Sequence, residues 1–123
     1  MLGDRPLVAF VGVANLARAR FFYESVLGLR IIEVTPFALV ADANGTTLRI
    51  TPVPTVSPHA YTALGWTVAD LAASLRALEA NGVPCLRYPW LTQDEDGVWH
   101  APDGARIAWF NDPDGNVLSL HQA

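Results

Sequence analysis

The sequence predicts an α+β fold made of two β-α-β-β-β modules within one domain. The chain has 123 residues, of which 51% are hydrophobic, so it can bury the core of one ordinary domain. The same succession of strand and helix patterns occurs twice along it. Between the two occurrences, the segment 52–59 contains three prolines in eight residues, which is typical of a connector. We therefore expect one domain over residues 1–123, with modules at about residues 5–53 and 60–122.

The first module is expected to contain a strand, a helix and three further strands. Residues 7–13 are apolar enough for a largely buried strand, and Asn15 can cap the helix that follows. Apolar residues then recur at helical spacing until Gly28, which favours the end of a helix. A tight turn at Asn44-Gly45 separates the last two of the three strands, which are expected at 29–35, 37–42 and 46–52.

The second module repeats this order. Residues 61–68 are expected to form a strand, and Asp70 can cap a helix that ends at Asn81-Gly82. Apolar leucines at helical spacing give that helix its buried side: Leu71, Leu75 and Leu78. A turn over 112–116 separates the last two of three further strands, which are expected at 83–88, 105–111 and 116–121, with a looser stretch through Trp99.

The composition argues against several classes of partner. The net charge is −4 and no cluster of Lys or Arg is present, so nucleic acid is not an expected partner. No apolar run approaches the roughly 20 residues of a membrane span, and the first residues lack the pattern of a secretion signal. Cys85 is the only cysteine, which is typical of a reducing compartment. We expect a soluble, cytoplasmic protein.

Several motifs occur together in a specific order. The segments 13–15, 20–23 and 27–29 in the first module, followed by Asp112-Pro113-Asp114-Gly115-Asn116 near the other end, resemble the vicinal oxygen chelate superfamily. This is the group of glyoxalases, bleomycin-resistance proteins and extradiol dioxygenases. The resemblance implies a curved eight-stranded mixed sheet with helices on its outer face. It also implies a small-molecule ligand in the concave face and a homodimer.

Members with metal chemistry carry His or Glu at one position on each of four strands. The resemblance places those positions at Val8, Arg49, Ala63 and Ser119 of this sequence. None of these side chains is a suitable ligand for a divalent ion of that class. We therefore expect neither a metal nor another cofactor, and no catalytic residue can be named.

Arg49 is the most informative residue of the expected ligand site. Strand alternation puts Leu48 and Ile50 on the face that meets the helices, so Arg49 and Thr47 should point into the concavity. A guanidinium there can grip a carboxylate or phosphate of a ligand, because its fork binds such groups bidentately. Its alternative partner is an internal acid such as Glu33, and the sequence favours neither.

Four further residues complete the set of candidate ligand contacts. Phe10 shares the face of Val8, and Trp109 lies opposite Ser119 if the turn at 112–116 gives the simplest register. A shift of one residue would place Phe110 there instead. His121 follows Ser119 on the same face and could act as a general acid or base; its alternative is a frayed residue close to the terminus.

The acidic run Asp94-Glu95-Asp96 has two interpretations. Carboxylates so close together repel one another, so a solvated loop is the simpler one. The functional alternative is the rim of a pocket that attracts a cation. An anionic ligand at Arg49 would oppose that alternative, and the sequence does not decide between them.

These observations favour a metal-independent protein that binds a small, partly aromatic molecule, for example to sequester a toxic or antibiotic-like compound. The planar ligand would lie against Trp109 and Phe10, and Arg49, Ser119 and His121 would orient it. The main alternative is an enzyme, a glyoxalase-like lyase or isomerase. A third alternative is a dimeric interaction module with a filled cavity, against which the polar inward-facing residues argue.

Overall fold

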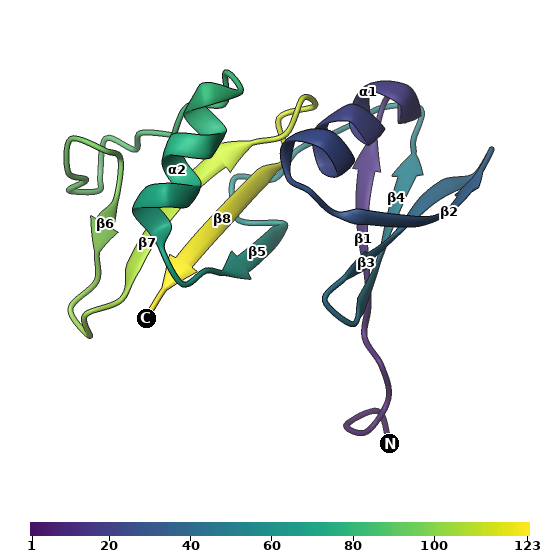
Figure 1. Cartoon of the computed structure of the whole chain (residues 1–123), viewed down its shortest axis with the longest axis horizontal. Helices are drawn as coiled ribbons and strands as arrows, with labels where there is room; N and C mark the ends of the chain where they lie inside the picture. Colours follow the sequence, from purple (N-terminus) through teal and green to yellow (C-terminus); the bar gives the residue numbers. More distant parts are fainter. The chain divides into compact units, whose positions relative to one another are not determined.

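The computed structural model describes residues 1–123, and the chain divides into two compact units, Met1–Ser57 and Pro58–Ala123 (Figure 1). Each unit contains one four-stranded mixed sheet, and each follows the order β-α-β-β-β along the chain. The predicted α+β fold with two such modules is therefore confirmed, with its eight strands hydrogen-bonded as two separate sheets. Residues 53–63, which hold the end of the proline-rich connector, contain no helix or strand.

The first unit has a capped helix after its first strand, and its first and last strands are parallel neighbours in the sheet. Its elements are β1 (Val8–Val13), α1 (Leu16–Arg20), a π-helical continuation η1 (Phe21–Val26), β2 (Arg30–Thr35), β3 (Ala38–Ala43) and β4 (Thr46–Pro52). The strand order is β1-β4-β3-β2, with β1 parallel to β4 and the other pairs antiparallel. Asn15 caps α1 as predicted, because its Oδ1 accepts the Arg18 amide at 2.9 Å. The π-helical turn was not predicted.

The core of the first unit lies where α1 packs against β3 and β4. Leu48 and Ile50 of β4 are buried there, whereas Arg49 between them is half-buried, as strand alternation predicts. Asn44 and Gly45 both have positive φ, 51° and 95°, which is the conformation that a tight two-residue hairpin turn requires.

The second unit places one helix on one side of its sheet. Its elements are β5 (Leu64–Thr67), α2 (Leu71–Ala80), β6 (Trp99–His100), β7 (Arg106–Asn111) and β8 (Val117–Gln122), in the sheet order β5-β8-β7-β6. Asp70 caps α2 as predicted, since its Oδ1 accepts the Ala73 amide at 3.0 Å. The apolar side of α2 packs on β8, and its three predicted leucines are buried: Leu71, Leu75 and Leu78.

The segment 83–88 was predicted to be a strand, and this prediction was wrong. Only one backbone hydrogen bond joins it to β7, from the Leu86 amide to the Trp109 carbonyl. Pro84 has no amide to donate, and the Gln93 side chain takes the place of a partner strand: it accepts from the Tyr88 amide and donates to the Leu86 carbonyl, both at 2.8 Å. The strand that follows α2 in this unit is instead the short β6.

The strand expected at 61–68 is shorter than predicted. The ladder of β5 covers only Leu64–Thr67, because the chain bends over 60–62. In that bend the rings of His59 and Tyr61 stack with their centroids 4.8 Å apart. One more backbone bond, from the Ala63 amide to the Val117 carbonyl, ties the bend to β8.

The turn over 112–116 is held by a buried carboxylate. Asp112 is only 4% exposed, and its Oδ1 accepts the amides of Asp114 and Asn116, both at 2.9 Å. Its Oδ2 accepts Nδ2 of Asn116 at 2.8 Å. These bonds explain why the sequence carries acids and amides in this turn, and they fix the register of β7 against β8. No helix of the chain combines the length and apolar composition needed to cross a membrane.

Candidate functional site

Phe10 and Arg49 meet on the sheet face of the first unit that is opposite to buried Leu48 and Ile50. Arg49 lies directly between Phe10 of β1 and Val40 of β3. Phe10 is 63% exposed, so the row offers an open aromatic ring beside a cation. We call this row the unit 1 face.

The proposed internal partner of Arg49 lies one strand further, because Glu33 is the register partner of Val40. No ion pair joins Arg49 to Glu33 in this structure. No other acid of the first unit pairs with Arg49 either. The Arg49 guanidinium therefore keeps its capacity to bind an anionic group.

Trp109, Ser119 and His121 share one face of the second sheet, which we call the unit 2 face. Trp109 of β7 is the direct partner of Ser119 of β8, which confirms the predicted register. His121 lies next along β8, between Ile107 and Thr67. This face is opposite to α2, because the adjacent residue Gln122 points to the helix and its Oε1 accepts the Leu71 amide at 2.8 Å.

The indole of Trp109 is anchored at its polar end. Its Nε1 donates to Oγ1 of Thr62 at 3.1 Å. Trp109 is on β7, Thr62 precedes β5, and β8 lies between these strands, so the indole reaches across β8. A ring held at both ends loses little further freedom when a ligand packs on it.

Two aromatic side chains contact Trp109 and a third packs on one of them; the four form what we call the aromatic cluster: Tyr88, Trp90, Trp99 and Trp109. Tyr88 meets Trp109 edge to face at 5.6 Å, Trp99 lies at 6.4 Å from it, and Tyr88 and Trp90 are 4.9 Å apart. Burial raises the pKa of the Tyr88 phenol, which therefore stays neutral at neutral pH. Sequence reasoning did not single out Tyr88, because its position beside Trp109 depends on the tertiary fold.

Ser119 owes its position to the glycine beside it. A Cβ built on Gly65 would stand only 2.5 Å from the Ser119 Oγ, so the hydroxyl occupies the space that any other residue at 65 would fill. Ser119 is half-buried next to the anchored indole. The unit 2 face thus combines a rigid aromatic surface with one small hydroxyl donor and an imidazole.

The four positions to which the resemblance assigned metal ligands lie in two units. Val8 and Arg49 belong to the first unit, and Ala63 and Ser119 to the second. Across the chain, no group of three or more His, Cys, Asp or Glu side chains is arranged to hold a metal ion. An alanine, a valine, a guanidinium and a hydroxyl do not form a donor set for a divalent cation, so these residues do not fit the metal.

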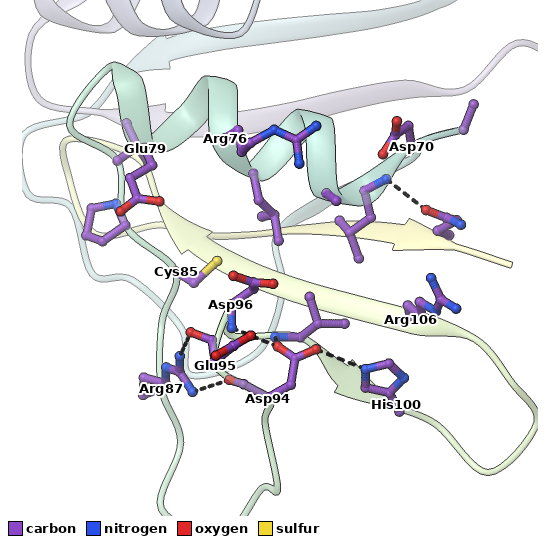
Figure 2. Close-up of a pocket in the computed structure, with 18 residues that line it drawn as sticks. Asp70, Arg76, Glu79, Cys85, Arg87, Asp94, Glu95, Asp96, His100 and Arg106 are labelled. Atoms are coloured by element: carbon purple, nitrogen blue, oxygen red, sulfur yellow. Dashed lines mark hydrogen bonds and ion pairs between the residues drawn. The ribbon is translucent and has the colours of Figure 1, made fainter.

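A second feature, which sequence reasoning missed, is a groove of about 700 Å³ on the other side of the second sheet (Figure 2). Its walls are α2 and the segment 83–98, and Figure 2 shows the Cys85 thiol between them. Ionisable side chains form much of its lining: Asp70, Arg76, Glu79, Arg87, Asp94, Glu95, Asp96, His100 and Arg106. The acidic run at 94–96 was the one indication of this groove in the sequence.

Asp94 organises the wall of the groove that the segment 83–98 forms. Its Oδ1 accepts the amides of Asp96 and Val98, and its Oδ2 lies 3.0 Å from Nε2 of His100. Burial opposes ionisation of Asp94, but the hydrogen bonds from His100 and from the two amides outweigh it and lower its pKa. Arg87 closes the same loop by donating to the carbonyls of Asp94 and Glu95 at 2.6 and 2.7 Å.

Cys85 lies in the middle of the groove and is half-buried, outside any strand, whereas the strand prediction for 83–88 had included it. A Cβ built on Gly97 would come within 2.6 Å of its Cβ, and Gly97 also has a φ of 90°, so this neighbour must be glycine. Burial raises the pKa of the Cys85 thiol, and Glu79, Asp94 and Asp96 raise it further, against the effect of Arg87. The thiol is therefore not an activated nucleophile.

Comparison with known proteins identifies the family. The sequence model of the Glyoxalase/Bleomycin resistance protein/Dioxygenase superfamily matches residues 6–120. No curated protein sequence matches the chain.

Solved structures with the same fold include a glyoxalase family protein from Bacillus anthracis, with 14% identity, a TM-score of 0.77 and coverage of 97% of this chain and 94% of that one. A lactoylglutathione lyase from Agrobacterium tumefaciens has 15% identity, a TM-score of 0.76 and coverage of 100% and 96%. A fosfomycin resistance protein from Listeria monocytogenes has 14% identity, a TM-score of 0.75 and coverage of 95% and 91%. At these identities, the likeness concerns the fold.

Proposed function

This chain belongs to the glyoxalase/bleomycin resistance protein/dioxygenase superfamily, and we propose that it binds a small, partly aromatic molecule without the help of a metal ion. The observation that carries the proposal is the Trp109 indole, held across β8 by Thr62 beside the hydroxyl of Ser119. A planar ligand gains most from a rigid aromatic surface with a few convergent polar groups. The side chains at the four metal positions support the metal-independent form of the proposal.

The proposed contacts are the five residues that the sequence singled out. Trp109, Ser119 and His121 offer stacking, a hydroxyl and an imidazole on the unit 2 face. Phe10 and Arg49 offer a ring and a cation on the unit 1 face, where Arg49 would bind an anionic group. Sequestration of a toxic or antibiotic-like aromatic compound is the activity that such a binding surface would serve.

Titration of tryptophan fluorescence with a panel of planar aromatic compounds and antibiotics tests this proposal. We expect saturable quenching by at least one compound, unchanged by a chelator and lost in Trp109→Phe. Trp66→Phe is the matched control, because Trp66 pairs with Leu120 on the helix side of the same sheet. Absence of binding across the panel, or equal quenching in Trp109→Phe and Trp66→Phe, would contradict the proposal.

A glyoxalase-like lyase or isomerase is the second candidate, and the position of His121 on the unit 2 face favours it. His121 lies one pair along from Ser119, within the same face as the proposed ligand contact. It would act there as a general acid or base. Turnover of a bound compound that is lost in His121→Gln, with binding retained, would support this enzyme over a binding protein.

The proposal also includes a homodimer in the cytoplasm. β2 is an edge strand of its sheet, and its Ile32 and Val34 side chains are 51% and 56% exposed, which suits a contact with a second copy. The unpaired Cys85 suits a reducing compartment. Light scattering after size exclusion should give twice the mass of the chain, and Val34→Lys should shift it toward the monomer.

A further inference from the structure

The unit 2 face presents aromatic rings and almost no charge. Trp99 of β6 is the register partner of Ile107, which pairs in turn with His121, so Trp99 stands on the same face as Trp109. The strand residues that share this face are uncharged, and the imidazole of His121 is their only ionisable group. Trp90, from the segment 83–98, adds a ring that is 76% exposed. A ligand on this face therefore meets ring surfaces and neutral polar groups.

Every arginine of the second unit lies on the other side of its sheet. The chain has no lysine, and the three arginines of this unit all line the groove beside α2 (Figure 2): Arg76, Arg87 and Arg106. Arg106 belongs to β7, but its register partners His100 and Gln122 are on the helix side. An anionic ligand therefore finds no guanidinium on the unit 2 face, where a carboxylate or phosphate would need one.

The negative charge of the chain is concentrated in the same unit. With histidines counted as neutral, residues 58–123 contain eight acidic side chains and three arginines, a net charge of −5. Residues 1–57 contain four acidic side chains and five arginines, a net charge of +1. The total of −4 does not show this asymmetry. The field of the second unit raises the concentration of cations around it and lowers that of anions.

The acidic run at 94–96 lies at the edge of the aromatic cluster. It belongs to the loop between Trp90 and Trp99, and Gln93, the residue before the run, is the bridge partner of Trp99. Arg87 donates to two carbonyls of the run and offsets one of its three negative charges. The run thus starts one residue from a partner of Trp99, within the roughly 8–10 Å over which charges act in physiological salt.

We propose that the aromatic molecule of the proposed function, on which this inference rests, is a planar cation: a heteroaromatic ring system with a quaternary or protonated nitrogen. The face of an aromatic ring carries the negative part of its quadrupole and attracts a cation within about 6 Å of the ring centre, an indole most strongly. Three of the four rings in the aromatic cluster are indoles. The acidic run then serves as a rim that attracts the cation. Arg49, the candidate for anionic groups, belongs to the first unit.

Titration of the ¹⁵N-labelled full chain with three quinolines of matched size tests this inference. N-methylquinolinium is a cation, 4-methylquinoline is uncharged at neutral pH, and quinoline-4-carboxylate is an anion. The indole N–H signals report each tryptophan separately, so we expect saturable shifts at Trp90, Trp99 and Trp109. Trp66 is the internal control, because it lies on the helix side of the same sheet. The cation should bind at least about threefold more tightly than the neutral compound, and the anion most weakly.

Variants that remove one ring test the contribution of the aromatic cluster. Trp90→Leu and Tyr88→Leu should each bring the affinity for N-methylquinolinium closer to that for 4-methylquinoline, because each keeps an apolar side chain but removes a quadrupole. Trp90 is exposed enough for its variant to fold, and a native-like amide spectrum checks this for both. Phe37→Leu is the control, since it removes an equally exposed ring from the first unit.

Variants that remove two charges test the contribution of the acidic run. Glu95→Gln with Asp96→Asn should weaken the binding of N-methylquinolinium at least about twofold at about 20 mM salt, and that of 4-methylquinoline not at all. Asp4→Asn with Glu24→Gln is the matched control, because it makes the same change of charge in the first unit.

Three results would overturn the inference. Equal binding of the three quinolines, or tightest binding of quinoline-4-carboxylate, would show that the face does not select a cation, while the proposed function would stand because an aromatic molecule still binds. Shifts confined to Trp66 would place the cation on the helix side. Absence of saturable shifts with all three quinolines would also overturn it, and the proposed function would fall with it only if the wider panel of aromatic compounds failed to bind as well.

Discussion

Replacement of Gly65 by alanine should destabilise the chain through one contact. The Cβ would stand 2.5 Å from the Ser119 Oγ, while the Ser119 carbonyl oxygen and Cβ are at 3.6 and 3.9 Å, which are ordinary distances. The hydroxyl must therefore rotate away or the strands must separate. Overpacking of this kind costs about 1–3 kcal/mol, against a gain of about 0.5–1 kcal/mol from removing a flexible glycine from a strand.

A double-mutant cycle with Ser119→Ala isolates that contact. In the Ser119→Ala background the obstructing oxygen is gone, so Gly65→Ala should be neutral or stabilising by up to about 1 kcal/mol. With Ser119 present, the same change should lower the free energy of unfolding, giving a coupling energy of about 1–3 kcal/mol in urea denaturation. Equal effects of Gly65→Ala in both backgrounds would show that the Ser119 hydroxyl does not obstruct a side chain at position 65.

Three further predictions concern the second unit. Hydrogen bonds lower the pKa of Asp94 below the ordinary 3.8 despite burial, so ionised Asp94 stabilises the fold above its unfolded pKa, and this contribution is lost as the pH falls through the folded pKa. Asp94→Asn should therefore weaken the fall of the urea midpoint at acid pH, by less than about 1 kcal/mol because the side chain is partly exposed. An unchanged acid dependence would contradict this prediction. Gln93→Ala should cost about 2–3 kcal/mol in urea denaturation, because three backbone groups lose their partner. Gln93→Glu should recover none of this loss, because a carboxylate oxygen would face the carbonyl oxygens of Leu86 and Gly97, and wild-type stability of that variant would contradict the role of the amide group. Thr62→Val should cost about 1 kcal/mol and shift the emission of Trp109, whereas unchanged emission would mean that the indole is not anchored there.

The regular parts of the fold could be predicted from local patterns. Asn15 and Asp70 predict where their helices begin, because an N-cap side chain accepts hydrogen bonds from amides two or three residues away. Strand alternation placed Arg49 on the face opposite to Leu48 and Ile50, and the turn at 112–116 set the partner of Trp109. These features depend on neighbours in sequence.

The segment between α2 and β7 could not be predicted, because its structure depends on a side chain. The Gln93 side chain forms the hydrogen bonds with backbone groups that a neighbouring strand would otherwise form. The hydrophobic periodicity of the sequence does not indicate such a bridge. The same holds for the groove. Its lining comes from α2, from the loop at 94–96 and from the ends of β7 and β8, and only the folded chain brings Glu79 and Asp96 to one end.

Native mass spectrometry of the purified protein, with metal analysis of the same sample, tests whether the chain binds an aromatic molecule without a metal ion. It reports the mass of the assembly, any bound metal and any retained small molecule together. We predict a dimer without stoichiometric metal that carries, or takes up, an aromatic compound, and we expect this compound to be lost in Trp109→Phe. Near-stoichiometric nickel, zinc or iron would contradict it, because Val8, Arg49, Ala63 and Ser119 offer no donor set for such an ion.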